Sequence, residues 1–221
     1  MKGSDTTFMD AAKHKEGLRQ RMREHRRGCD AEQLREDSDV IGRKALALQE
    51  VDGASVVCCY LAMRGEVGTD LLLQAFWTSG RRVYVPAFDP DRGAYRWAKL
   101  EAHTKLATGP WNTTEPAVRT WIGDETPDLI ITPGMAFDRS GSRLGHGGGS
   151  YDRLLVEAPA AARVGLALER QIVETVPVED HDQGVDIIVT EKSIYRCSEN
   201  MNMNTNRPDH RDSDASGRRL A

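Results

Sequence analysis

Hydrophobic residues gather along the chain in short runs that alternate with longer amphipathic segments. Helical character is expected over residues 10–27, 31–49 and 69–78. Strands covered on both faces are expected at five apolar runs: residues 55–61, 82–86, 129–131, 164–168 and 185–189. Strands that alternate with helices at this spacing predict a single-domain α/β fold. Its open, mainly parallel sheet would carry helices on both faces, in three α/β/α layers.

Weaker patterns complete this picture. A short antiparallel pair is expected around residues 95–100, and an edge strand at residues 193–196. The α/β domain is expected to span residues 10–197. Residues 1–9 are expected to be disordered, and residues 198–221 form a polar tail with almost no large apolar side chains to offset the cost of ordering.

A glycine cluster follows the apolar run at residues 129–131. Four of the five positions from Gly145 to Gly149 are glycine, and Ser150 is placed to cap a helix that starts there. A strand, a glycine-rich loop and a helix N-terminus together can bind an anion through backbone N–H groups. A flexible surface loop is the plain alternative. Arg143 before the glycines and Asp152 after them favour the anion-binding interpretation.

Composition narrows the class of protein. The 221 residues carry a net charge of −4, with 39% hydrophobic and 29% charged residues, which is typical of a soluble domain. The basic segment at residues 13–27 is local, so a general nucleic-acid binder is not expected. No apolar run is long enough for a membrane span, and the N-terminal residues lack the core of a secretory signal, so a cytoplasmic protein is expected. The four cysteines lack zinc-site spacing and are expected to be reduced.

Common nucleotide and hydrolase signatures are absent from the sequence. It contains no G-x-x-x-x-G-K-[ST] segment, so a P-loop protein is excluded. The glycines do not form G-x-G-x-x-G after a first strand, which argues against a dinucleotide fold. No G-x-S-x-G elbow of a serine hydrolase is present either.

Acidic residues occur at two further places of interest. Glu66 follows the strand expected at residues 55–61, and open α/β sheets bind ligands at the carboxyl ends of their strands. A solvated loop glutamate is the alternative. Residues 179–182 (EDHD) form an acidic cluster that is either a polar turn or, together with Asp152, a site for Mg²⁺, which prefers oxygen ligands.

Four segments resemble motifs of one protein family. Residues 133–153, PGMAFDRSGSRLGHGGGSYDR, resemble the pattern P-G-x-x-F-D-x-x-G-x-R-L-G-x-G-x-G-[YF]-Y-D of the 5-formyltetrahydrofolate cyclo-ligase family, whose members are also called methenyltetrahydrofolate synthetases. Residues 15–19 (KEGLR), residues 60–67 (YLAMRGEV) and residues 176–191 are similar to other family segments in the same order. The resemblance covers roughly residues 13–196.

The resemblance implies an enzyme that uses ATP and Mg²⁺ to convert 5-formyltetrahydrofolate to 5,10-methenyltetrahydrofolate, with release of ADP and phosphate. It implies phosphorylation of the formyl oxygen followed by attack of N10, with Arg143 and Glu66 as catalytic residues. The implied ATP-binding residues are Lys15, Arg19, Arg143, Leu144, Gly145, His146, Gly147, Gly148, Gly149, Ser150 and Tyr151. The implied folate-binding residues are Leu61, Glu66, His146, Gly147, Gly148, Gly149 and Ser150. The implied magnesium ligands are Asp152 and Asp182, with Asp180 as an alternative to the second.

Three loop positions differ from the residues common in the family. Gly148 stands where lysine is frequent, His146 where arginine or tyrosine is frequent, and Ser150 replaces an aromatic residue of the folate site. The last change favours an alternative, a catalytically weak paralogue that binds nucleotide or folate as a regulatory module. The expected partner is a reduced folate. A monomer that binds neither nucleic acid nor membranes is expected.

Overall fold

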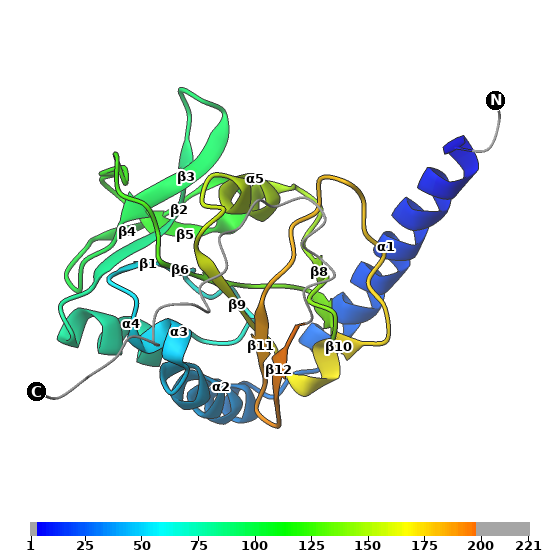
Figure 1. Cartoon of the computed structure of the whole chain (residues 1–221), viewed down its shortest axis with the longest axis horizontal. Helices are drawn as coiled ribbons and strands as arrows, with labels where there is room; N and C mark the ends of the chain where they lie inside the picture. The colour runs from blue at the N-terminus through cyan, green and yellow to red at the C-terminus, as the bar shows by residue number, and fades with distance from the viewer. Residues whose placement is uncertain (1–3, 198–221) are drawn as a thin grey trace, which may run out of the picture.

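The computed structural model describes residues 4–197 and contains a seven-stranded sheet. From one edge to the other its strands are β12 Ile194–Arg196, β11 Ile187–Val189, β9 Ala162–Leu166, β6 Leu129–Thr132, β1 Val56–Cys58, β2 Arg82–Asp89 and β3 Ala94–Lys99. Strands β11, β9, β6, β1 and β2 run parallel, and the edge strands β12 and β3 are antiparallel to their neighbours. The mainly parallel sheet predicted from the sequence is therefore confirmed (Figure 1).

One face of the sheet is covered by α2 Ala31–Leu46, α3 Gln49–Asp52 and α4 Asp70–Thr78. The side chain of Asp30 caps α2 by accepting a 2.9 Å hydrogen bond from the backbone N–H of Glu32. Ile41 and Ala45, one turn apart on α2, are fully buried against the sheet. The apolar positions of the helices and the β-branched strand residues thus form the main core.

The opposite face is shared by a helix and a second, smaller sheet. Helix α5 Ser150–Val156 packs Leu154 and Leu155 against β1, β2 and β6. Beside it lie β7 Ala136–Asp138, β8 Arg143–Leu144 and β10 Ile172–Val173, in the order β10-β7-β8. Helix α1 Ser4–Arg27 packs on this small sheet through Leu18 and Met22. The prediction of helices on both faces is confirmed, but half of the second layer is a sheet.

Several element boundaries differ from the expectation. The structure places residues 4–9 in α1, so this part of the segment expected to be disordered is helical. The helix expected over residues 31–49 ends at Leu46 and is followed by the separate turn α3. Strands β7 and β8 lie in a segment for which no strand was expected. Residues 1–3 and the polar tail 198–221 lie outside the described residues.

A small hairpin lies beside β2. Strands β4 Leu106–Thr108 and β5 Thr114–Pro116 pair as a hairpin, with the 3₁₀ turn η1 Pro110–Asn112 between them. A second 3₁₀ turn, η2 Glu169–Gln171, precedes β10.

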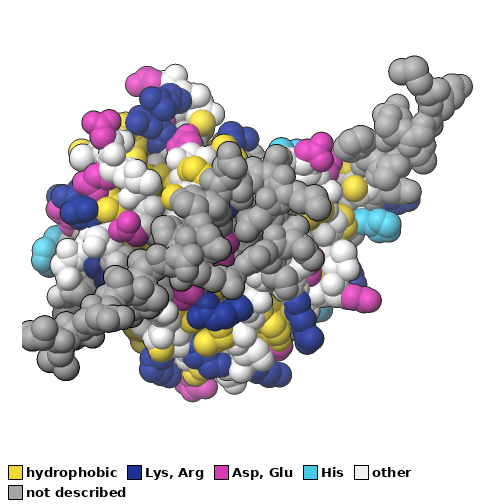
Figure 2. Space-filling view, viewed as in Figure 1, with side chains coloured by type: hydrophobic (Ala, Val, Ile, Leu, Met, Phe, Trp, Pro, Cys, Tyr) yellow, Lys and Arg dark blue, Asp and Glu magenta, His cyan; other side chains and the backbone are white. Residues whose placement is uncertain are grey.

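Within residues 4–197, no helix combines the length and the apolar character needed to cross a membrane. On the face seen in Figure 2, basic and acidic side chains are interspersed around the rim, in keeping with the small net charge.

Adjacent cysteines illustrate how completely the central strand is enclosed. Cys58 packs toward α5 and Cys59 toward α2 and α4, as expected for neighbouring positions in an extended segment. Burial raises the pKa of the Cys59 thiol to about 12, and it raises the pKa of the Cys58 thiol as well. All four cysteines are free thiols.

The small sheet is docked on the main sheet by one ring. Phe137 of β7 is fully buried, and it lies between two glycines that have no side chain to hold it away. A Cβ on Gly134 would lie 2.5 Å from the ring, and a Cβ on Gly165 of β9 would lie 2.8 Å from it. This close approach sets the distance of β7 and β8 from the main sheet. It thereby also positions the start of the glycine loop, residues 145–149.

Gly165→Ala is expected to lower the free energy of unfolding by about 1–3 kcal/mol, because the added methyl group overlaps the Phe137 ring. Gly17→Ala is the matched control, since a Cβ there meets nothing within 4 Å on the exposed face of α1. It should raise stability by about 0.5–1 kcal/mol through helix propensity. Urea unfolding of both variants tests this. Equal stability of Gly165→Ala and the parent protein would contradict the close packing.

Candidate active site

Two cavities lie on either side of the glycine loop, residues 145–149, and the first opens at the carboxyl ends of β1, β2 and β6. The first has a volume of about 500 Å³, and its lining includes the loop after β1, the end of β2 and aromatic residues from the β2–β3 and β4–β5 hairpins. The second has a volume of about 1150 Å³ and is lined by α1, the glycine loop, α5 and the acidic turn 179–182. Six residues line both cavities and form what we term the shared wall: Arg143, Gly145, Gly148, Gly149, Asp152 and Arg153.

Local backbone geometry explains why glycine is needed in the loop of residues 145–149. Gly147 and Gly149 have φ values of 106° and 63°, a region that residues with a side chain rarely adopt. Gly149, and not Ser150, is the residue that precedes the first turn of α5, and no side chain caps that turn. The expected capping role of Ser150 is therefore wrong. Ser150 is instead the first residue of the helix and lines the first cavity.

A buried ion pair joins the two ends of the loop. Arg143 Nη2 lies 2.6 Å from Asp152 Oδ1, and the side chains of Arg143 and Asp152 are 2% and 16% exposed. The backbone N–H of Gln183 also donates to Asp152 Oδ1, at 3.1 Å. The Arg143 guanidinium lies over the ring of Tyr151, while its Nε is buried without an acceptor in the described part of the chain. The charge of Arg143 is thus balanced within the protein.

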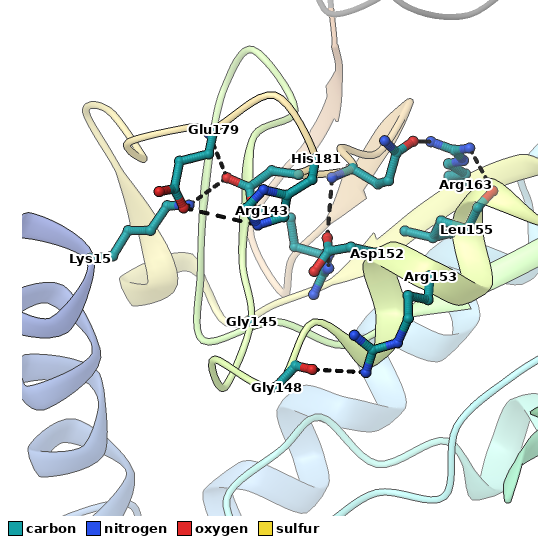
Figure 3. Close-up of polar contacts among 12 residues, drawn as sticks. Lys15, Arg143, Gly145, Gly148, Asp152, Arg153, Leu155, Arg163, Glu179 and His181 are labelled. Carbon is teal, nitrogen blue, oxygen red and sulfur yellow. Dashed lines mark hydrogen bonds and ion pairs between the residues drawn. The ribbon is translucent and has the colours of Figure 1, made fainter. Parts of the chain in front are cut away.

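Helix α1 reaches the second cavity through two cations, Lys15 and Arg19, of which Figure 3 shows Lys15 beside Glu179. Lys15 Nζ lies 2.6 Å from Glu179 Oε2 and 2.5 Å from Asp182 Oδ2. Burial alone would lower the pKa of Lys15, but these two carboxylates outweigh it, so the pKa lies above its ordinary value. Arg19 Nε donates a 3.0 Å hydrogen bond to the carbonyl of Gly145. One helix therefore contacts both the acidic turn and the glycine loop.

The carboxylates of the second cavity retain free ligand atoms. Among the described residues, Asp152 bonds Arg143 and the N–H of Gln183 through Oδ1, and Asp182 bonds Lys15 and the N–H of Glu179 through Oδ2. Oδ1 of Asp182 lies 3.8 Å from His181 Nε2, beyond hydrogen-bond distance. Ligand atoms of Glu179, His181 and Asp182 lie within 4.8 Å of one another. One oxygen of each aspartate is therefore available to a hard cation, and the residues fit magnesium chemically.

Glu66 lies at the border of the first cavity and is only 6% exposed. Its Oε1 lies 3.2 Å from His146 Nε2 and 3.4 Å from Arg26 Nη1, and its Oε2 accepts a 3.0 Å bond from the N–H of Met63. Burial alone would raise the pKa of this carboxyl. The hydrogen bond with His146, the charge of Arg26 and the Met63 amide together hold the pKa below its usual value. Glu66 is thus kept ionised as an acceptor.

The structure divides the residues expected at the site between the two cavities. Those that line the second cavity are Lys15, Arg19, Arg143, Leu144, Gly145, Gly147, Gly148, Gly149, Asp152 and Asp182. Those that line the first are Leu61, Glu66, Arg143, Gly145, His146, Gly148, Gly149, Ser150, Tyr151 and Asp152. Gly147, expected at both subsites, lines only the second cavity. His146 and Ser150, also expected at both, line only the first.

Two features of the site were missed from the sequence. The first is Arg26, whose Nη2 donates a 3.1 Å bond to Gly134 while Nη1 faces Glu66. The second is an aromatic group in the first cavity formed by Phe88, Tyr95 and Trp111, with ring centroids 5.7–6.0 Å apart. The turn DPDRG after Phe88 was a usable signal, because a hairpin there pairs Phe88 with Tyr95.

Comparison with known proteins points to one family. The family model described as "5-formyltetrahydrofolate cyclo-ligase family" matches residues 11–191. A 5-formyltetrahydrofolate cyclo-ligase from Escherichia coli strain K12 is 32% identical over 179 residues, which are 79% of this chain and 98% of that protein. The Mus musculus protein of the same name is 28% identical over 191 residues, 81% of this chain and 94% of the relative.

A solved structure shares the fold. The NMR structure of the Aquifex aeolicus 5,10-methenyltetrahydrofolate synthetase aligns with a TM-score of 0.73 and 27% sequence identity. The alignment covers 91% of this chain and 99% of that one. The architecture described above is therefore that of a known group of enzymes.

Arg26→Met is expected to raise the pKa of Glu66, because it removes a cation facing a buried carboxylate. A carboxyl with a lowered pKa stabilises the fold above its unfolded-state value, and this contribution is lost as the pH falls through the folded-state pKa. The variant should therefore lose stability at a higher pH than the parent. NMR titration of the Glu66 side-chain carboxyl measures the shift directly.

Arg21→Met is the matched control for this experiment. Arg21 lies exposed on the same helix, so its replacement removes the same charge without touching Glu66. The control should leave the Glu66 titration within the scatter of the parent. If Arg26→Met and Arg21→Met gave the same titration curve, Arg26 would not be the cation that holds Glu66 ionised.

Proposed function

Since the chain belongs to the 5-formyltetrahydrofolate cyclo-ligase family and is an enzyme of that class, we propose that it uses ATP and Mg²⁺ to close the ring of 5,10-methenyltetrahydrofolate. The observation that carries the ATP-dependent mechanism is the shared wall between an aromatic cavity and a cavity lined by cations and carboxylates. A phosphoryl group must pass between two bound molecules in this reaction. Two adjoining cavities with a common boundary suit that requirement.

The reaction has two steps in this proposal. The formyl oxygen of 5-formyltetrahydrofolate attacks the γ-phosphorus of ATP, the bond to the bridging oxygen breaks, and ADP leaves. N10 then attacks the activated formyl carbon, its proton is lost, and phosphate departs with the former formyl oxygen. Phosphoryl transfer of this kind depends on positioning and on neutralising charge rather than on a protein nucleophile.

The first cavity takes the folate. Glu66 is ionised and therefore only accepts hydrogen bonds, which suits the N–H groups on the polar edge of a pterin. Phe88, Tyr95 and Trp111 offer ring faces and edges, and each aromatic contact is worth about 0.5–1.5 kcal/mol beyond area burial. Trp111 is 74% exposed, so a bound ring system would cover apolar surface that now faces water. These rings offset the aromatic residue that Ser150 replaces.

The second cavity takes the ATP. From α1, Arg19 contacts the glycine loop and Lys15 contacts the acidic turn, and Arg143 lies in the shared wall. The glycine loop lets backbone N–H groups approach phosphate oxygens without interference from Cβ atoms. Lys15 is paired with Glu179 and Asp182, so bound phosphates would share this cation with them.

Asp152 and Asp182 would hold the magnesium ion through the oxygens that their protein contacts leave free. The ion would neutralise phosphate charge and keep some of its waters, as Mg²⁺ does at phosphate sites. Arg143 orients Asp152, and Lys15 orients Asp182. Glu179 and His181 lie beside Asp182 and line the same cavity.

Incubation with 5-formyltetrahydrofolate, ATP and Mg²⁺ should produce the near-ultraviolet absorbance of methenyltetrahydrofolate, with one ADP and one phosphate formed per turnover. Omission of ATP, or chelation of Mg²⁺, should abolish the signal. Folate binding is measured in parallel by isothermal titration. Intact folate binding without product at high protein concentration would reject the catalytic proposal and support the regulatory alternative.

Asp152→Asn and Asp182→Asn are each expected to lower kcat by about 100-fold or more, because an amide binds Mg²⁺ more weakly than a carboxylate. The dissociation constant for folate should change much less. Asp180→Asn is the matched control, since Asp180 is an exposed neighbour in the same turn. Steady-state kinetics over a range of Mg²⁺ concentrations separates the effects. Equal losses of turnover and folate affinity would argue against a metal role, and a larger loss in Asp180→Asn would reassign the second ligand.

A further inference from the structure

We propose that Arg153 is a catalytic residue that contacts the phosphoryl group as it passes between the two cavities. This inference rests on the proposed function and goes beyond it, because no motif used above assigns a role to this arginine. Arg143 and Arg153 are the two guanidinium groups of the shared wall. Their surroundings differ, and that difference separates a structural cation from one available to substrate.

Arg143 is held by the protein itself. Its side chain is 2% exposed and its Nη2 lies 2.6 Å from the carboxylate of Asp152. A buried guanidinium in such a pair has little freedom to follow a moving phosphoryl group, and separating the pair would leave an uncompensated buried charge. Arg143 is therefore suited to fixing the wall and the Asp152 carboxylate.

Arg153 has the opposite character. It is exposed, and its Nη2 donates a 2.9 Å hydrogen bond to the neutral carbonyl of Gly148. No ion pair of Arg153 with a carboxylate occurs within the described residues 4–197. Figure 3 shows its side chain turned from α5 toward the loop at Gly148. The positive charge therefore faces the place where both cavities meet without an acidic partner to balance it.

Gly149 leaves space for the guanidinium of Arg153. A Cβ on Gly149 would lie 3.2 Å from Arg153 Nη1, and the φ of 63° at Gly149 already disfavours a side chain. With no side chain at Gly149, the guanidinium lies against the loop backbone, where it bonds the carbonyl of Gly148. Its remaining N–H groups can then reach oxygens of a group bound on either side of the wall.

The chemistry at this boundary calls for such a cation. While the bond between the γ-phosphorus and ADP breaks and the bond to the formyl oxygen forms, negative charge is spread over three phosphoryl oxygens. A guanidinium can donate two parallel hydrogen bonds to these oxygens and remains protonated throughout, so no proton changes hands in this contact. The same contact would follow the phosphate until its bond to the formyl carbon breaks.

The test compares Arg153→Met and Arg153→Lys with the parent enzyme and with Arg21→Met, an exposed arginine replaced on α1. Arg153→Met should lower kcat by about 100-fold or more, as for other cations that stabilise a transferring phosphoryl group, while the Michaelis constants change by less than about fivefold. Arg153→Lys should fall between, because an ammonium keeps the charge but not the planar fork. Arg21→Met should match the parent.

A readout specific for this role is rescue of Arg153→Ala by added guanidinium ion, which should restore part of kcat in a saturable manner. Thermal unfolding of each variant shows whether loss of the Gly148 hydrogen bond has disturbed the fold. If Arg153→Met folds poorly, the rescue experiment and Arg153→Lys decide the matter. A kcat within twofold of the parent in Arg153→Met, or a folded Arg153→Ala without rescue, would overturn the proposal. A parent protein without turnover would instead reject the proposed function itself.

Discussion

The largely buried ion pair of Arg143 and Asp152 holds together the wall shared by the two cavities. Arg143 comes from β8 and Asp152 from the first turn of α5, so their 2.6 Å contact closes the glycine loop at both ends. The same carboxylate receives the N–H of Gln183 and thereby ties the acidic turn to the loop. Removing one partner of a buried ion pair commonly lowers the free energy of unfolding by about 3–5 kcal/mol. This contact therefore both shapes the wall and keeps the two side chains in place.

Helix α1 packs outside the main sheet and contacts three segments around the shared wall. Lys15 contacts the acidic turn, Arg19 the glycine loop and Arg26 the carboxylate of Glu66. These three cations lie along one face of the helix and reach three segments that are distant in the sequence. Leu18 and Met22 lie between them and pack on the small sheet. Three of the seven lysines and arginines of this helix therefore serve contacts with the rest of the fold, while Lys13, Arg21 and Arg27 are exposed.

The sequence predicted the parts of the structure that depend on local patterns. Runs such as Leu129–Ile131 are apolar because both faces of the strand are covered, and the glycine cluster is visible because each glycine lies near the next. The small sheet was missed because Arg143 and Leu144 form a two-residue strand with a charged member. The Lys15–Asp182 contact spans 167 positions, so no local pattern predicts it. Arg26 and Trp111 join the site only through helix docking and hairpin geometry, which depend on the packed core.

In the proposed reaction, a phosphoryl group crosses the shared wall to the formyl oxygen of the folate. The most direct measurement uses 5-formyltetrahydrofolate labelled with ¹⁸O in the formyl group, with ATP and Mg²⁺, followed by mass analysis of the phosphate released. Each phosphate should carry one ¹⁸O atom, because its fourth oxygen is the former formyl oxygen. Unlabelled phosphate with the ¹⁸O released as water would show that the ring closes without phosphorylation of the formyl oxygen, and would contradict the account.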